Sequence, residues 1–512
     1  MNIEKITTLG QLKKSGYVAK SIKDEVRDNL IKSIQNKENP FTGIMGYEDT
    51  VIPDTERAIL SRHNILFLGL RGQAKTRMAR QMVDLLDEYI PVVAGSEVND
   101  DPLKPFSKFA IDTIAELGDK TPIQWLHRSE RYGEKLATPD VSVADLIGDI
   151  DPIKAANLKL SFSDEKVIHY GIIPRSNRGI FVINELPDLQ ARIQVSLFNI
   201  LQEGDIQIRG FKLRMPLDIL FVFTANPEDY TNRGSIVTPL KDRIQSQILT
   251  HYPKNIETSL MITEQEAKIN DAQKRLVSIS DLAKRLVEQV SFEARSNEYV
   301  DKKSGVSARL TIAAFENAVS SAERRAIMHN EKNTQVWISD LTGIIPSITG
   351  KIELVYEGEQ EGPYEVALNL LNKSIRNQFV QYFPNPELTK KRKTNKKSTE
   401  EPAVENPYKL ITGWFDAGNH LDLFLDMKDA DKIASLYKVD GLYGVVKKHY
   451  PHANELESAL LMEFVLHGLA TFSMINKKMI DGKIEFKDLM GSIMNLGNMG
   501  FGEDDFNESD YQ

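Results

Sequence analysis

The sequence predicts an α/β protein in which a parallel sheet with crossover helices is followed by mostly helical segments. Between residues 40 and 253, short apolar runs alternate with helical patterns. Gly, Pro or polar residues bound each run, and such alternation is typical of parallel strands joined by helices. From residue 254 onward, apolar residues recur at spacings of three and four, which indicates helices. The expected strands are residues 64–69, 89–95, 179–185 and 218–226.

Changes in this pattern predict six segments. The charged linker among them contains KKRKTNKK (390–397), which could bind nucleic acid or an acidic partner, although a solvated linker is the favoured interpretation. The acidic tail is expected to be disordered. The segments are an N-terminal helical extension (1–39), an α/β domain (40–253), a helical domain (254–384), the linker (385–406), a helical C-terminal segment (407–496) and the tail (497–512).

Composition narrows the class of protein. The chain has 512 residues, a hydrophobic fraction of 41% and a net charge of −9, which is ordinary for a globular protein and makes nucleic-acid binding unlikely. It has no cysteine, so disulfides and thiolate metal sites are excluded. No apolar stretch approaches the roughly 18 residues of a membrane span, and the N-terminus lacks the apolar segment of a signal peptide. We therefore expect a cytoplasmic protein without a membrane partner.

The stretch LFLGLRGQAKTRMAR (66–80) has the outline of a phosphate-binding loop. Such loops have Gly, four residues, then Gly-Lys-Ser/Thr, because backbone N–H groups and a helix start converge on phosphate. Here Gly69 begins the motif, Ala74 replaces the second glycine, and Lys75 and Thr76 complete it. Gly72 keeps the loop open. Lys75 would reach the β- and γ-phosphates, and the Thr76 hydroxyl would bind Mg²⁺.

A second apolar run, Ile180 to Ile183, leads to Asn184 and Glu185. Asp-Glu is usual at this place, where the Asp helps to hold the metal ion and the Glu polarises the attacking water. Asn184 can still accept a hydrogen bond but brings no charge. The sequence therefore predicts weaker Mg²⁺ binding at this site.

Three further residues have the character of nucleotide-sensing groups. Asn226 ends a third run, predicted to lie between the other two strands, where it could orient water against the γ-phosphate. Arg243 follows Asp242 and could stabilise transition-state charge, often from a neighbouring subunit. Arg309 begins a helix of the second region and could fold over the nucleotide.

These five elements, in this order over residues 40 to about 325, resemble the AAA+ ATPases. More narrowly, they are similar to the helix-2-insert group, which contains MoxR-type ATPases and the ATPase subunit (subunit I) of magnesium chelatase. PFTGIMGYEDTVI resembles the adenine-side segment of that group, and LFNILQEGDIQIRGFKLRMPLDILFVFTANPED resembles its helix with an inserted hairpin, followed by sensor 1. The resemblance implies an AAA+ P-loop NTPase core followed by a helical lid.

By position, the resemblance implies the role of each site residue. Glu185, Asn226 and Arg243 would be catalytic, as Walker B glutamate, sensor 1 and arginine finger. Thr76, Asn184 and Glu185 would hold Mg²⁺. The segment 96–140 departs from the family because it is longer than a minimal core needs. The nucleotide-binding residues would be Ile44, Gly46, Gly69, Gly72, Gln73, Ala74, Lys75, Thr76, Arg77 and, as sensor 2, Arg309.

The resemblance implies a Mg-ATP-dependent ring, commonly a hexamer, that remodels or matures a partner protein complex. Such ATPases often act with a separate von Willebrand factor A domain protein, and the client remains open. One alternative is the ATPase subunit of a metal chelatase. Another, prompted by Asn184, is an ATP-binding scaffold with little turnover. A transcription activator is disfavoured by the charge and by the absence of the polymerase-contacting loop.

Overall fold

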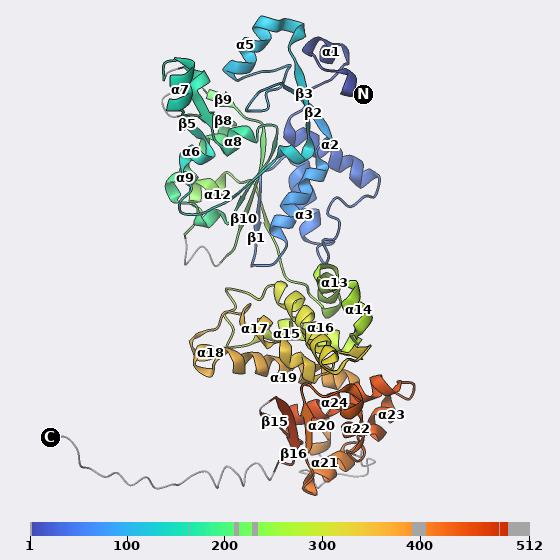
Figure 1. Ribbon diagram of the computed structural model, residues 1–512. Helices are drawn as coiled ribbons and strands as arrows, with labels where there is room; N and C mark the ends of the chain where they lie inside the picture. Colours follow the sequence, from blue (N-terminus) through green and yellow to red (C-terminus); the bar gives the residue numbers. More distant parts are fainter. Residues whose placement is uncertain are drawn as a thin grey trace, which may run out of the picture. The chain divides into compact units, whose positions relative to one another are not determined.

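The computed structural model describes residues 3–162, 164–208, 214–227, 234–391, 406–480 and 482–489. Most of the predicted linker and all of the predicted acidic tail lie outside these residues. The chain forms two compact units, Met1–Pro253 and Lys254–Gln512 (Figure 1). Within the described part of the chain, no helix is both long enough and apolar enough to cross a membrane.

The first unit is built on a five-stranded parallel sheet with the strand order β11-β1-β10-β7-β4. The predicted third strand, β10, does lie between β1 and β7. All carboxyl ends of a parallel sheet meet at one edge, so the residues after these strands come together there. The strands are β1 (Ile65–Leu68), β4 (Tyr132–Leu136), β7 (Gly179–Asn184), β10 (Ile219–Ala225) and β11 (Ser246–Leu249).

Both faces of this sheet are buried, which explains why its central strands are continuous apolar runs. Ile180 and Val182 of β7 belong to the core on one face, whereas Phe181 and Ile183 belong to the core on the other face. The helices α2, α3 and α4 cover the first face, and α8, α9, α10 and α12 cover the second (Figure 1). The helices of this unit are α1 (Leu9–Lys14), α2 (Ile22–Gln35), α3 (Val51–Leu60), α4 (Lys75–Gln81), α5 (Lys108–Leu117), α6 (Val143–Leu146), α7 (Pro152–Leu158), α8 (Ile172–Arg175), α9 (Ala191–Ser196), α10 (Phe198–Glu203) and α12 (Thr238–Asp242).

One expected strand lies elsewhere. The run at 89–95 forms β2 (Tyr89–Val93), which pairs antiparallel with β3 (Ile123–His127) in a separate two-stranded sheet. Pro91 lies within β2, and proline cannot donate a hydrogen bond in a central strand. Two strands of the central sheet were not predicted: β11, at one edge, and β4, at the other edge, which lies inside the segment 96–140. That segment therefore supplies part of the core sheet in addition to its extra residues.

The predicted inserted hairpin follows α10. Its strands are β8 (Asp205–Gln207) and β9 (Arg214–Pro216), which pair antiparallel, and residues 209–213 between them lie outside the described residues. A second small hairpin pairs β5 (Gly148–Ile150) with β6 (Ile168–Tyr170). Both hairpins are additions to the five-stranded sheet.

The N-terminal helix α2 belongs to the core of the first unit. Ile22, Val26 and Leu30 of α2 are buried against the sheet. Glu25 accepts two hydrogen bonds of 2.7 Å from the guanidinium of Arg131, and both side chains are almost fully buried. This ion pair joins α2 to the residue that precedes β4.

The described part of the second unit is helical with two small sheets. One continuous hydrophobic core includes residues of the predicted helical domain and of the predicted C-terminal segment. Its small sheets pair β12 (Val277–Ser278) with β13 (Thr334–Gln335), and order β14 (Leu421–Phe424), β16 (Lys483–Lys487) and β15 (Asn476–Ile480). Its helices are α13 (Ile256–Glu266), α14 (Asp271–Leu276), α15 (Asp281–Ser296), α16 (Arg309–His329), α17 (Ile345–Thr349), α18 (Tyr356–Glu361), α19 (Pro363–Tyr382), α20 (Pro386–Lys391), α21 (Lys409–Asp416), α22 (Asp429–Tyr437), α23 (Leu442–His449) and α24 (Glu455–Thr471).

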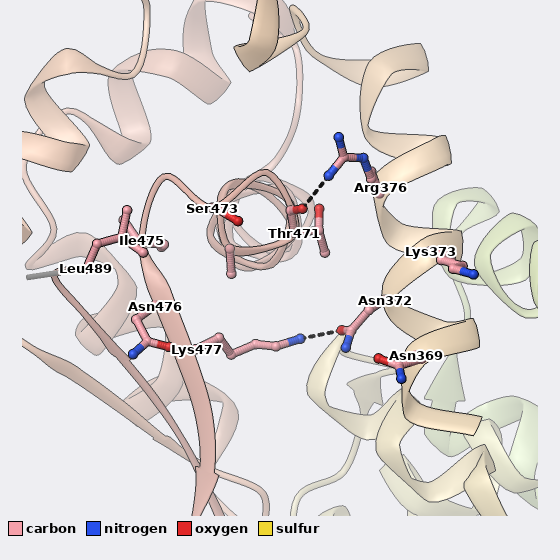
Figure 2. Close-up of a pocket in the computed structure, with 11 residues that line it drawn as sticks. Asn369, Asn372, Lys373, Arg376, Thr471, Ser473, Ile475, Asn476, Lys477 and Leu489 are labelled. Atoms are coloured by element: carbon pink, nitrogen blue, oxygen red, sulfur yellow. Dashed lines mark hydrogen bonds between the residues drawn. The ribbon is translucent and has the colours of Figure 1, made fainter. Parts of the chain in front are cut away.

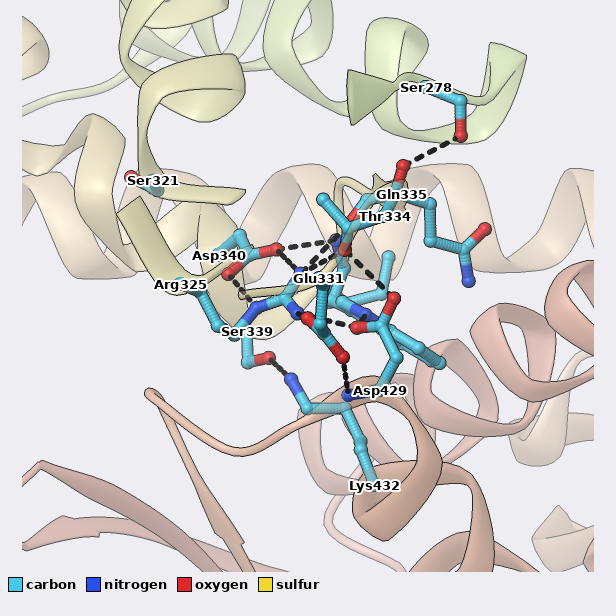
Figure 3. Close-up of polar contacts among 12 residues, drawn as sticks. Ser278, Ser321, Arg325, Glu331, Thr334, Gln335, Ser339, Asp340, Asp429 and Lys432 are labelled. Carbon is cyan, nitrogen blue, oxygen red and sulfur yellow. Dashed lines mark hydrogen bonds and ion pairs between the residues drawn. The ribbon is translucent and has the colours of Figure 1, made fainter. Parts of the chain in front are cut away.

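A buried ionic network joins the two parts of this core (Figure 3). Arg325 of α16 lies 3.2 Å from Asp340 and donates a hydrogen bond to Asp429, the first residue of α22. Asp429 also accepts hydrogen bonds from Thr334, at 2.8 Å, and from the Trp337 indole, at 2.7 Å. Every oxygen of the two carboxylates therefore has a protein partner, as burial of charge requires.

We predict that Arg325→Met destabilises the second unit strongly. The substitution leaves Asp340 and Asp429 buried without their cation, which typically costs roughly 3–5 kcal/mol. Urea unfolding monitored by tryptophan fluorescence measures the change. The control is Arg324→Met, because Arg324 is exposed and pairs with Asp426 at the surface, where a pair is worth about 1 kcal/mol or less. Equal effects of the two substitutions would contradict this account.

Candidate nucleotide-binding site

The loop between β1 and α4 has the conformation that its sequence predicts. Gly72 adopts a φ of 71°, and Ala74, which precedes α4, adopts the left-handed region with a φ of 55°. A Cβ atom on Gly69 would lie 2.0 Å from the Thr250 hydroxyl oxygen. Glycine is therefore required at position 69 by the close approach of the chain after β11.

Lys75 lies in the centre of this site. Its ammonium donates hydrogen bonds to the loop carbonyls of Gly69 and Leu70, the second at 2.8 Å. It also donates to the Asn226 side-chain oxygen at 2.8 Å. Lys75 and Asn226 are both more than 90% buried. The structure thus brings together the predicted phosphate-binding lysine and the predicted sensor at the end of β10.

Asn184 connects three elements at the carboxyl edge of the sheet. Its side-chain oxygen accepts hydrogen bonds from the Thr224 hydroxyl of β10 at 3.0 Å and from the Thr76 hydroxyl of α4 at 3.3 Å. Its amide nitrogen donates to Glu134 of β4 at 2.6 Å. An aspartate here could accept the first two hydrogen bonds but could not donate the third.

Glu134 places a carboxylate beside the position where Asn184 lacks one. Two hydrogen bonds from Arg80, at 2.9 and 3.0 Å, and one from the Tyr132 hydroxyl, at 2.8 Å, reach this carboxylate. Partial burial alone would raise the pKa of Glu134, but the hydrogen bonds from Arg80 and Tyr132 outweigh it and hold the pKa below its ordinary value. Glu134 is therefore ionised at neutral pH.

Glu185 directly follows β7 in the left-handed region, with a φ of 54°. Its backbone N–H donates to the Thr224 hydroxyl at 3.1 Å, so the same threonine fixes both Asn184 and Glu185. A non-glycine residue in this region is uncommon, and backbone strain of this kind can mark a functional site. The backbone is thus turned at the residue that the sequence predicts as the catalytic carboxylate.

The predicted adenine-side segment contacts the loop through a tyrosine. Ile44 is buried in the core beside α4, and Gly46 has a φ of 80°. The hydroxyl of Tyr47 donates to the Gln73 carbonyl at 2.9 Å. The Gln73 side-chain oxygen accepts a 2.6 Å hydrogen bond from the Thr250 hydroxyl and lies against Gly69.

The predicted arginines lie in different surroundings. Arg243 directly follows α12, donates to Gln202 of α10 at 2.8 and 3.0 Å, and stacks over Phe198. Among the described residues, none of its hydrogen bonds reaches the phosphate loop. Arg77 lies in the first turn of α4, whereas Arg309 begins α16 of the second unit. The roles of all three stay predictions.

The donor set fits a magnesium ion that shares its coordination with phosphate. Mg²⁺ prefers hard oxygen ligands and is usually held by few protein groups, with the remaining positions filled by water and phosphate. Thr76 and Asn184 offer such oxygens side by side, and Glu134 adds negative charge behind them. In the described part of the chain, no group of three His, Cys, Asp or Glu forms a separate metal cage.

Sequence reasoning missed Glu134, Thr224 and Thr250. Thr224 could have been found, because it lies two residues before Asn226 on a predicted strand. Glu134 carries no motif, and its place depends on the register of β4 with β7. Thr250 is recognised only through its approach to Gly69.

Comparison with known proteins was consistent with this geometry. Residues 157–248 match the family model of the Sigma-54 interaction domain. The chain is 26% identical over 333 residues to "Magnesium-chelatase subunit ChlI" of Chlorella vulgaris, covering 60% of this chain and 86% of the relative. It is also 26% identical over 236 residues to the "Magnesium-chelatase 38 kDa subunit" of Cereibacter sphaeroides, covering 44% of this chain and 64% of that protein.

A solved structure of the complex between subunits BchI and BchD of magnesium chelatase aligns with 63% of this chain and 98% of its own at 20% identity. The TM-score of this alignment is 0.33. The strand order, the phosphate loop and the sequence similarities together identify the chain as an AAA+ ATPase, and hence as an ATP hydrolase.

Proposed function

We propose that this chain is a Mg-ATP-dependent ring ATPase that remodels or matures a partner protein complex. The observation that carries the proposal is the meeting of Lys75, Thr76, Asn184 and Asn226 at one edge of three neighbouring strands. The inserted hairpin after α10 supports the remodelling part, because it is an addition to the five-stranded sheet. The ring, the client and a von Willebrand factor A partner belong to the proposal.

In this mechanism, the phosphates of ATP replace the Gly69 and Leu70 carbonyls as partners of Lys75. Bound Mg²⁺ would neutralise phosphate charge beside Thr76 and Asn184. Glu185 would accept a proton from the attacking water, and Asn226 would orient that water. Arg243 of a neighbouring subunit would face the γ-phosphate, which accounts for its place outside the loop of its own subunit.

We further propose that Glu134 takes over the electrostatic role that aspartate has in related sites. Its carboxylate is one hydrogen bond behind Asn184 and is ionised. The negative charge therefore lies on β4, one hydrogen bond away from position 184, and not at position 184 itself. This arrangement favours turnover over the alternative of a scaffold that binds ATP without hydrolysing it.

The second candidate function is that of the ATPase subunit of a metal chelatase. It is favoured by the relatives named above, which are subunits of magnesium chelatase. Affinity capture with the Glu185→Gln variant as bait, in the presence of ATP, separates the two candidates when the captured proteins are identified. A porphyrin-binding subunit among them would favour the chelatase, and a different complex would favour remodelling.

Lys75→Ala is expected to weaken ATP binding by roughly tenfold or more, because the phosphates lose a charge-assisted hydrogen bond. Calorimetric titration with ATP and Mg²⁺ measures the affinity. Lys120→Ala is the control, since Lys120 is exposed on the same unit and distant in sequence from the loop. An affinity that is unchanged in Lys75→Ala would refute the assignment of the loop.

Glu185→Gln is expected to keep ATP affinity and to lower steady-state turnover by roughly 10²–10⁴-fold, because the general base is lost.

Arg243→Ala and Lys75→Ala should each be inactive alone. A mixture of these two variants should regain part of the turnover, because some interfaces would combine an intact loop with an intact Arg243. A mixture without activity would contradict shared sites.

Asn184→Asp is expected to lower the melting temperature, through repulsion from Glu134, and to increase the Mg²⁺-dependent gain in ATP affinity, through the added negative charge. The new carboxylate would face Glu134 across the present 2.6 Å hydrogen bond. Adding Glu134→Gln should restore the melting temperature, because the glutamine amide can donate to the aspartate. The two substitutions should be non-additive in stability by about 0.5–3 kcal/mol. Additive effects on stability would rule out the coupling, and ATP titrations with Mg²⁺ and with EDTA measure the gain in affinity.

A further inference from the structure

A polar cavity of about 540 Å³ lies in the second unit, between α19, the end of α24 and β15 (Figure 2). Four residues of α19 at helical spacing form one wall. The opposite wall comes from the chain that leaves α24 and enters β15. The lining residues are Asn369, Asn372, Lys373, Arg376, Ala470, Thr471, Ser473, Ile475, Asn476, Lys477 and Leu489.

The lining is basic and rich in hydrogen-bond donors. Lys373, Arg376 and Lys477 are cations, and three of the other lining residues are asparagines. Among the described lining residues there is no aspartate or glutamate. Glu387, outside the lining, offsets the charge of Arg376, so the positive potential that attracts anions comes mainly from Lys373 and Lys477.

Lys477 is the cation that extends across the cavity (Figure 2). Its side chain crosses the cavity to Asn372 (Figure 2), where its ammonium donates a 2.7 Å hydrogen bond to the amide oxygen. That partner carries no charge, and burial lowers the pKa of Lys477 to about 8. An anion in the cavity would stabilise the charged form of this lysine.

Arg376 is held at the other side of the cavity. Its guanidinium donates to the Thr471 carbonyl at 2.7 Å, lies 4.3 Å from the centre of the Phe472 ring, and pairs with Glu387 outside the lining. Arg376 is therefore fixed before any ligand arrives. Fixed donors lower the ordering cost of binding.

We propose that this cavity binds a small phosphorylated molecule, with its phosphate at Lys477, whose side chain extends into the cavity (Figure 2). The volume is within the range of small-molecule sites and exceeds what a phosphate group alone would fill. The asparagine amides and the hydroxyls of Thr471 and Ser473 suit the hydroxyl groups of a sugar-like portion. The site is separate from the phosphate loop in sequence and belongs wholly to the second unit.

The test is calorimetric titration of the full-length chain carrying Lys75→Ala with ribose 5-phosphate. The Lys75 substitution removes the main phosphate contact of the nucleotide site, so that binding there does not mask the result. We expect saturable binding, and an affinity at least tenfold lower when Lys477→Met is added. Lys478→Met is the matched control, because Lys478 is the exposed neighbour on the same strand and is not in the lining.

A second variant covers the case in which Lys477→Met does not fold. Asn372→Asp keeps the shape and supplies Lys477 with an internal carboxylate, so it should also abolish binding. No binding of ribose 5-phosphate, or equal loss in Lys477→Met and Lys478→Met, would overturn the proposal. Equal affinity for ribose would show that the phosphate is not recognised, and equal affinity for inorganic phosphate would show that no organic portion is held.

Discussion

The hydrogen bonds of Asn184 hold the candidate site together. A single amide at the end of β7 accepts from β10 and α4 and donates to β4, so it fixes three elements of the sheet unit at one point. Its acceptor and its donor are both used, which a carboxylate could not achieve. The position therefore has a geometric role as well as an electrostatic one, and the departure from the usual aspartate is matched by Glu134 on the adjacent strand.

Much of this arrangement could be predicted from the sequence. β1, β7 and β10 are apolar because both faces are buried, so their ends and the polar residues after them were recognisable. β4 escaped because Tyr132–Leu136 lies at the edge of the sheet and is largely half-exposed, with mixed polarity. The role of Glu134 depends on strand register, which a single sequence does not specify. Pro91 was the available signal that β2 lies outside the central sheet.

The second unit shows a different limit of sequence reasoning. Helical periodicity indicated its helices but not which of them share a core. Arg325, Asp340 and Asp429 are separated by up to about a hundred residues, yet they form one buried network. The cavity beside α19 is likewise assembled from distant segments. Neither feature has a local motif, because each depends on how the helices pack.

The left-handed backbone of Ala74 bears on how far the phosphate loop is ordered before a ligand binds. This conformation costs an alanine about 1–2 kcal/mol, whereas a glycine would adopt it freely. Alanine, however, has fewer conformations available when the loop is open than glycine has. Tyr47 and Thr250 hold the neighbouring Gln73 on both sides. The cradle for phosphate is thus shaped before ligand arrives, so that association requires little further loss of backbone entropy.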